Sequence, residues 1–342
     1  MQEIQPFVAR PRQSIGPSSE ASGEALAETE IQRRVLRSEF GVLAPLISDP
    51  AVTDVFFNGA RHVWVDRGAG LEQHPQLIFS EEELREFAVR LVSLGGRHID
   101  EANPCVDAKL GGGIRVHAVL PPISIAGTHL SLRIPRPRPL SLDDLDAAGF
   151  FSLIPMARIH ELVDRRDNIL ISGAAGSGKT TLLAAILSAA PEHERIVAIE
   201  DVAELQVHHP HFVALEARQA NLEGAGGIGL ARLVREALRM RPDRLVVGEC
   251  RGAEVRELLG ALNTGHDGGA GTVHANSLGD VPARLEALGA LADLGPTAIA
   301  RQTVSAIGRV LHVERKDGAR RLAQMGCFSI GPRDRLIVRE VV

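Results

Sequence analysis

Lysine, cysteine and aromatic residues are scarce in this chain of 342 residues. Of 38 lysines and arginines only three are lysines, there is no tyrosine, and aromatic residues make up 3% of the sequence. The hydrophobic cores must therefore be aliphatic. The three cysteines, Cys105, Cys250 and Cys327, lie far apart, which excludes a disulfide framework and a Cys-x-x-Cys zinc site. We expect a reducing, cytoplasmic environment.

Long apolar runs are also missing. No stretch of about 18 apolar residues occurs, so we expect no membrane-spanning segment, and the polar N-terminus does not resemble a signal peptide. The net charge of −5 and a pI of about 6.2 disfavour direct binding of nucleic acid. With 44% hydrophobic residues, a chain of this length is expected to form two domains.

The first domain is predicted to be a small α+β unit over residues 24–134, after a flexible tail over 1–23. A helical pattern covers 24–40, and 52–65 indicates a hairpin that turns at Asn58-Gly59. Ser80 and Glu83 form a capping box that opens a helix to about Leu94. Residues 114–120 and 128–134 alternate as strands do.

The second domain is predicted to be an α/β unit over 150–342, joined by a proline-rich linker over 135–149. The prolines of the linker favour an extended chain. Strand-like runs at 168–172, 195–199, 212–215 and 244–247 alternate with helices at about 156–165, 179–189, 229–239, 253–262 and 280–290. Such alternation predicts a largely parallel sheet between helices. Three further strands are expected after residue 309.

One motif points to chemistry. "GAAGSGKTT" follows a buried strand and opens a helix, which is the context of a phosphate-binding loop. Glycines let the backbone N–H groups point inward around phosphate oxygens, and the helix N-terminus adds positive charge. Lys179 would bridge the β- and γ-phosphates of ATP, and the Thr180 hydroxyl would bind Mg²⁺.

The residues predicted to bind the nucleotide are Gly173, Ala174, Ala175, Gly176, Ser177, Gly178, Lys179, Thr180 and Thr181.

Two carboxylates follow predicted strands of this domain. Glu200 ends "RIVAIE" and Glu249 ends "RLVVGE", and in a parallel sheet ligands bind at the carboxyl ends of the strands. Phosphoryl transfer requires a positioned water and Mg²⁺. The two glutamates are therefore rivals for holding the water.

Two histidines lie in the glycine-rich segment "NTGHDGGAGTVHAN". His266 and His274 are eight residues apart, which is not a standard spacing for a zinc-ligand pair. We therefore favour imidazole as a sensor of the γ-phosphate over a metal site.

Taken together, the phosphate loop, "IEDVAEL", "LEARQANLEG", "LRMRPDRLVVGECRGAEV" and the histidine segment resemble the secretion ATPase superfamily. The similarity is most specific to the tight-adherence (Flp) pilus assembly ATPases, which are close to the type IV secretion traffic ATPases. It implies a RecA-like phosphate-loop NTPase domain, and ATP held between the two domains of a hexamer subunit.

The resemblance also implies roles for individual residues. Glu200 becomes the better candidate for activating water, Glu249 lies on the Mg²⁺ side, and His266 and His274 form the histidine box. "DAKLGGGIRVHAVLPP" resembles the N-terminal arginine segment of the family. Arg115 and Arg133, with Arg218 as a further candidate, would bring positive charge to the nucleotide.

The function expected from this resemblance is an ATP-hydrolysing motor that drives pilus assembly. It would work as a homo-hexamer at the inner face of the cell membrane, together with membrane platform proteins. Three alternatives stay open at this point: a conjugation or DNA-transfer ATPase, a small-molecule kinase, and a nucleotide-binding scaffold without turnover. A zinc module with four cysteines, found in one branch of the family, is missing here.

Overall fold

The structure, a computed structural model, describes residues 38–68, 70–135, 139–218, 226–316 and 318–341. The chain divides between Arg136 and Pro137 into two compact units, which are described separately. The predicted tail over 1–23, most of the predicted helix over 24–40 and residues 136–138 of the linker lie outside the described residues.

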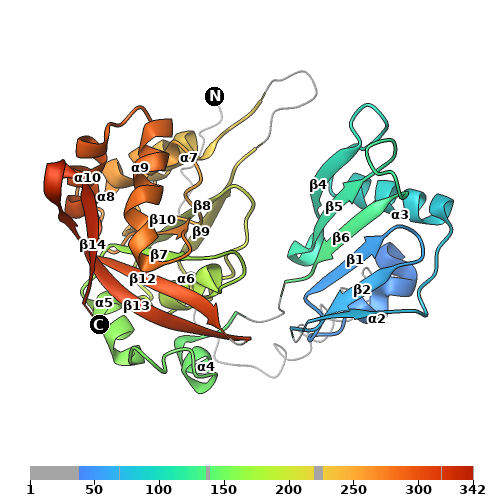
Figure 1. Cartoon of the computed structure of the whole chain (residues 1–342), viewed down its shortest axis with the longest axis horizontal. Helices are drawn as coiled ribbons and strands as arrows, with labels where there is room; N and C mark the ends of the chain where they lie inside the picture. The colour runs from blue at the N-terminus through green and yellow to red at the C-terminus, as the bar shows by residue number, and fades with distance from the viewer. Residues whose placement is uncertain (1–37, 69, 136–138, 219–225, 317, 342) are drawn as a thin grey trace, which may run out of the picture. The chain divides into compact units, whose positions relative to one another are not determined.

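The N-terminal unit is an antiparallel sheet with one long helix packed on it (Figure 1). The strand order is β3-β2-β1-β6-β5-β4. Ser80 and Glu83 make the predicted capping box at the start of α3. Leu84, Phe87 and Leu91 of this helix are buried against the sheet.

The elements of this unit are α2 (Ala44–Ile47), β1 (Asp54–Asn58), β2 (Val63–Asp66), β3 (Leu71–Gln73), α3 (Glu81–Leu94), β4 (Cys105–Lys109), β5 (Arg115–Val119) and β6 (His129–Arg133).

The hairpin, the long helix and the last two strands of the unit confirm the sequence prediction. β1 pairs with β2 and β5 with β6, both antiparallel. Strands β3 and β4 were not predicted. All three residues of β3 are exposed, and in β4 only Val106 and Ala108 are buried, so neither carries a strong hydrophobic pattern.

The C-terminal unit contains an eight-stranded mixed sheet of order β14-β13-β12-β7-β11-β10-β8-β9. The six strands from β12 to β9 are parallel, and β13 and β14 continue the sheet in antiparallel fashion. The predicted α/β class and parallel sheet are confirmed. The carboxyl ends of β7, β11, β10 and β8 consequently meet at one edge.

The strands of this unit are β7 (Ile169–Gly173), β8 (Ile196–Glu200), β9 (Phe212–Glu216), β10 (Arg244–Val247), β11 (Ala270–His274), β12 (Arg309–Lys316), β13 (Ala319–Ile330) and β14 (Leu336–Glu340).

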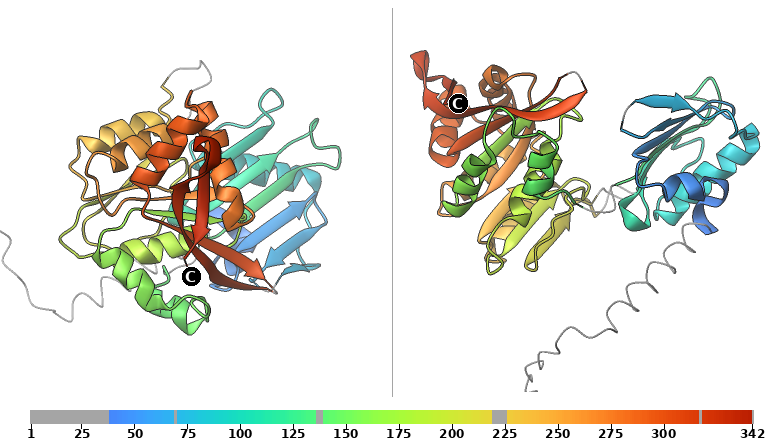
Figure 2. Two further views of the ribbon diagram at one scale, coloured as in Figure 1. Left: turned by 60° about the vertical axis from the view of Figure 1, so that its left-hand side comes forward. Right: turned by 90° about the horizontal axis from the view of Figure 1, so that it is seen from below.

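Helices cover both faces of this sheet, as Figure 2 shows from two further sides. One aliphatic core lies beneath α4, α5 and α6, and a second beneath α7, α8, α9 and α10. Among the described residues, no helix is both long enough and apolar enough to cross a membrane.

The helices are α4 (Leu142–Ala147), α5 (Met156–Asp164), α6 (Lys179–Ser188), α7 (Leu230–Leu238), α8 (Glu254–Leu262), α9 (Val281–Leu291) and α10 (Pro296–Ala306).

The segment predicted as an extended linker is partly helical. Ser141 and Asp144 form a capping box at the start of α4, and Leu142 and Leu145 are buried in the same core as α6. The prolines that discourage a helix stop at Pro139. Residues 141–149 therefore belong to the C-terminal unit.

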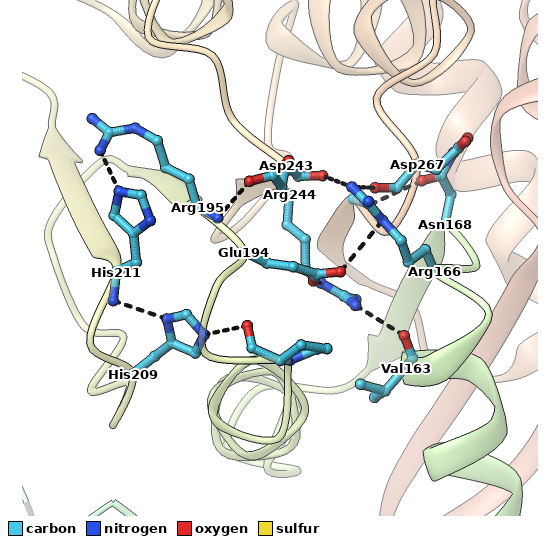
Figure 3. Close-up of polar contacts among 12 residues, drawn as sticks. Val163, Arg166, Asn168, Glu194, Arg195, His209, His211, Asp243, Arg244 and Asp267 are labelled. Atoms are coloured by element: carbon cyan, nitrogen blue, oxygen red, sulfur yellow. Dashed lines mark hydrogen bonds and ion pairs between the residues drawn. The ribbon is translucent and has the colours of Figure 1, made fainter.

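A buried ion pair lies at the amino-terminal edge of the parallel sheet (Figure 3). The Nε of Arg244, the first residue of β10, donates to the carboxylate of Glu194, and both side chains are at most 5% exposed. Arg244 Nη2 also donates to the Val163 carbonyl at 2.9 Å. Arg166 Nε lies 3.6 Å from the second oxygen of Glu194.

Neighbouring contacts tie together the segments that enter the strands (Figure 3). The Arg195 amide donates to Asp243 Oδ2 at 2.7 Å. Asn168 accepts from the Gly269 amide at 2.8 Å and donates to the Ala306 carbonyl at 2.9 Å. The entries to β7, β8, β10 and β11 and the end of α10 are thus joined, which fixes the strands that carry functional residues at the opposite edge.

We predict that Glu194→Gln destabilises the C-terminal unit strongly, because the Arg244 guanidinium would remain buried without a carboxylate. The expected loss is about 3–5 kcal/mol of unfolding free energy, measured by urea or thermal unfolding. Glu161→Gln is the matched control, since its ion pair with Arg158 is exposed and should contribute under about 1 kcal/mol. Equal losses in the two variants would contradict the prediction.

Candidate functional site

The phosphate loop connects a fully buried strand, β7, to α6. Gly176 and Gly178 have φ angles of 70° and 105°, in the region that glycine adopts without steric cost. A Cβ at Gly173 would collide with the Val313 carbonyl oxygen and lie 2.6 Å from Ser177 Oγ. The predicted segment Gly173–Thr181 has the strand–loop–helix geometry that its motif requires.

The Lys179 side chain is folded back onto its own loop. Only 6% of the residue is exposed, and its Nζ donates to the Gly173 and Ala174 carbonyls at 3.1 and 2.9 Å. His274 Nδ1 lies 3.2 Å from the same ammonium. Burial lowers the pKa of Lys179, and the nearby Glu249 carboxylate partly opposes this shift.

Glu249 and His274 approach the loop from the ends of two adjacent strands. Arg251 Nη2 donates to Glu249 Oε2 at 2.7 Å, and this bond raises the pKa of Arg251. His274 Nε2 lies 2.5 Å from Glu249 Oε1. Burial, followed by the charge of Lys179, lowers the pKa of His274, while Glu249 acts in the opposite direction. The net direction favours the uncharged form of the imidazole.

Two buried oxygens at this edge fit a hard cation. Glu249 Oε1 and Ser177 Oγ are buried, and no residue of the described ranges forms an aligned hydrogen bond with either atom. Thr180, the second residue of α6, is half-buried and lies three residues after Ser177. Carboxylate and hydroxyl oxygens are the ligands that Mg²⁺ prefers. Thr180 and Glu249 are thus suitable residues for the predicted Mg²⁺.

Glu200 ends β8, which is paired with β10, and is 4% exposed. Its Oε1 accepts from the amides of Glu204 and Leu205 at 2.9 and 3.1 Å, and Oε2 accepts from Leu205 at 3.2 Å. A Cβ on Gly248 would lie 2.6 Å from Glu200 Cγ. The carboxylate therefore holds the turn after β8 in place, close to the peptide that precedes Glu249.

The structure does not bring His266 to this site within one chain. His266 lies before β11 and its ring contacts the Ala261 carbonyl at 3.2 Å, whereas His274 is the last residue of β11. A five-residue strand is roughly 16 Å long, so the two imidazoles are at opposite edges of the sheet. The structure thus separates the two histidines within one chain, and their common role at the γ-phosphate stays a prediction.

The predicted arginines belong to other elements than the residues around Lys179. Arg218 is exposed and follows the edge strand β9, where its backbone pairs with Ile228. Residues 219–225 lie outside the described residues. Arg115 and Arg133 belong to the N-terminal unit. They are direct cross-strand partners on β5 and β6, although 17 residues separate them in sequence.

One contact residue was missed by sequence reasoning. Arg251 pairs with Glu249 and adds a positive charge beside the loop lysine. Its adjacency to Glu249 in "GECRG" was the available signal.

Comparisons with known proteins agree with this geometry. Residues 37–325 match the family model described as Type II/IV secretion system protein. A Mycobacterium tuberculosis protein, provisionally named as a conjugal transfer protein, is 49% identical over 312 residues, which cover 88% of this chain and 89% of the relative. The type IV secretion system protein VirB11 of Bartonella henselae is 29% identical over 269 residues, with 69% and 75% covered.

A solved structure shares the fold. The pilus retraction motor PilT, solved with bound ADP, has a TM-score of 0.57 at 20% identity and covers 90% of this chain and 81% of its own. The RecA-like fold class expected from the sequence is confirmed.

We predict opposite changes in the pKa of His274 when its two charged neighbours are neutralised. Lys179→Met removes a nearby positive charge and should raise this pKa, whereas Glu249→Gln removes a negative charge and should lower it further. NMR titration of the imidazole resonances measures both changes. Shifts of the same sign in the two variants would refute the arrangement.

Proposed function

Because the chain belongs to the type II/IV secretion system protein family, we propose that it binds MgATP at the phosphate loop and hydrolyses it to drive a secretion or pilus machine. The observation that carries this proposal is the meeting of Lys179, Glu249 and His274 at the carboxyl edge of the parallel sheet. These side chains come from three separate segments, and phosphoryl transfer requires such positioned charges around the γ-phosphate.

The chain's own residues have distinct tasks in this proposal. Lys179 exchanges its two carbonyl partners for phosphate oxygens. Neutral His274 contacts the γ-phosphate and reports its loss, Glu200 positions the attacking water, and Glu249 acts with Thr180 at the metal. When bound there, Mg²⁺ neutralises charge on the phosphate oxygens. Glu249 is the alternative water-positioning residue, since the oxygens of Glu200 accept backbone bonds.

The proposed assembly is a homo-hexamer that works at the cytoplasmic face of the membrane with platform proteins of the machine. The proposed cargo follows from the tight-adherence resemblance: pilus subunits. Transfer of DNA is the second candidate, favoured by the provisional name of the M. tuberculosis relative. A steeply salt-dependent stimulation of ATP turnover by DNA would support the second candidate. A small-molecule kinase would move neither of these cargoes.

Lys179→Ala should abolish ATP hydrolysis and weaken nucleotide binding, because no other described side chain donates an ammonium to the loop. Glu200→Gln should bind ATP but lower kcat by about 100-fold, with an unchanged dependence on Mg²⁺. Glu249→Gln should instead raise the Mg²⁺ concentration needed for half-maximal turnover.

Phosphate-release assays over a series of Mg²⁺ concentrations measure the turnover of all three variants. Normal turnover by Glu200→Gln would move the water role to Glu249, and an inactive wild-type chain would leave only a scaffold.

Arg115 and Arg133 are proposed to supply charge that stabilises the transition state. Arg115→Ala or Arg133→Ala should then lower kcat by up to about 10³-fold with little change in nucleotide affinity. Steady-state kinetics and nucleotide titration separate the two quantities. Arg85→Ala, which removes a half-buried arginine of α3 in the same unit, should be neutral. Equal losses in kcat and affinity would indicate simple binding.

A further inference from the structure

The hairpin formed by β12 and β13 extends beyond the end of the strand that carries the phosphate loop. β12 pairs with β7 from Arg309↔Ile169 to His312↔Ser172. Its last four residues, Val313–Lys316, continue past β7 in the same direction. Since the loop begins where β7 ends, this part of the hairpin runs alongside it (Figure 1). The close approach of Val313 to Gly173 is the direct evidence.

The register of the hairpin determines which side chains face the loop. Val313 pairs with Leu322 and Arg315 with Arg320, whereas Glu314 pairs with Arg321 on the opposite face. Val313 and Leu322 are fully buried. Because side chains two residues apart in a strand share a face, Arg315 and Arg320 prolong the buried, loop-facing side of the hairpin.

Arg320 makes contact with the loop itself. Its Nε donates to the Gly176 carbonyl at 2.9 Å, and its Cδ would lie 3.4 Å from a Cβ on Gly178. Phe150 lies 3.7 Å from the same position, and its carbonyl accepts from the Leu322 amide at 2.9 Å. The hairpin and Phe150 thus pack against the loop at Gly176 and Gly178, the two glycines with positive φ.

Two arginines meet at this end of the hairpin. Arg315 and Arg320 are exposed and directly opposite one another, and like charges in that position destabilise a strand pair. The exposed Lys316 follows. These groups would attract a polyphosphate, because guanidinium groups match phosphate oxygens in geometry and charge.

We infer that the β12–β13 hairpin is a second wall of the nucleotide site and that Arg320 is a positioning residue for the phosphate loop. Its bond to Gly176 holds the loop open for the phosphates of a nucleoside di- or triphosphate, and its charge, with that of Arg315, attracts them. This inference rests on the proposed function, since it requires nucleotide at the loop.

The test compares Arg320→Ala, Arg320→Lys and the control Arg321→Ala in the full chain. Arg321 is the next residue, carries the same charge and pairs with Glu314 on the other face. Arg320→Ala should weaken ADP and ATP binding and raise KM by about tenfold or more, with kcat changed less than threefold. Arg320→Lys should recover part of the loss, because the charge remains. Arg321→Ala should stay within twofold of the wild-type chain. Titration calorimetry and steady-state kinetics measure these values, and thermal unfolding confirms that each variant is folded.

Three outcomes overturn the inference, and they distinguish it from the proposed function. If the wild-type chain hydrolyses ATP and Arg320→Ala binds nucleotide equally well, the hairpin role is wrong and the proposed function stands. The same conclusion follows if Arg320→Ala and Arg321→Ala lose affinity equally. If the wild-type chain neither binds nor hydrolyses MgATP, the proposed function and the inference fail together.

Discussion

The ammonium group of Lys179 donates to two carbonyls of its own loop. The charged and polar residues of the site surround the ammonium in this position. A buried cation requires partners. His274 at the end of β11 contacts the ammonium, and Glu249 follows the neighbouring strand β10. Burial, followed by the charge of the ammonium, lowers the pKa of His274, and Arg251 pairs with the Glu249 carboxylate. Moving the lysine charge onto a phosphate would alter the electrostatic environment of each of these groups.

The parallel sheet assigns different physical tasks to its two edges. At the amino-terminal edge, Glu194, Arg244 and Asn168 join the strand entries through buried polar contacts. Forming these contacts costs the side chains conformational freedom and makes this edge of the sheet rigid. At the carboxyl edge, buried oxygens such as Glu249 Oε1 have no aligned donor within the described residues. This edge also brings the charged and polar groups of Lys179, Glu249 and His274 close together.

Local signals explain what could be predicted from the sequence. The Ser80 capping box, the Asn58-Gly59 turn and the glycine-lysine loop each depend on residues within a few positions of one another, and all three agree with the structure. The parallel arrangement then placed Glu200 and Glu249 on adjacent strand ends. The proline content of the linker concealed α4, whose cap lies just beyond the last proline.

Contacts between distant segments could not be derived in this way. Glu194 and Arg244 are 50 residues apart, and Arg320 is 144 residues from Gly176. His266 and His274 lie in a single glycine-rich segment. Because His274 ends the five-residue strand β11 and His266 precedes it, the two histidines lie at opposite edges of the sheet. The mechanical continuity of β13 has a further consequence. This twelve-residue strand contacts the phosphate loop through Arg320 at one end and pairs with β14 at the other. A pulling force on the edge strand β14 would therefore be transmitted along β13 to the phosphate loop.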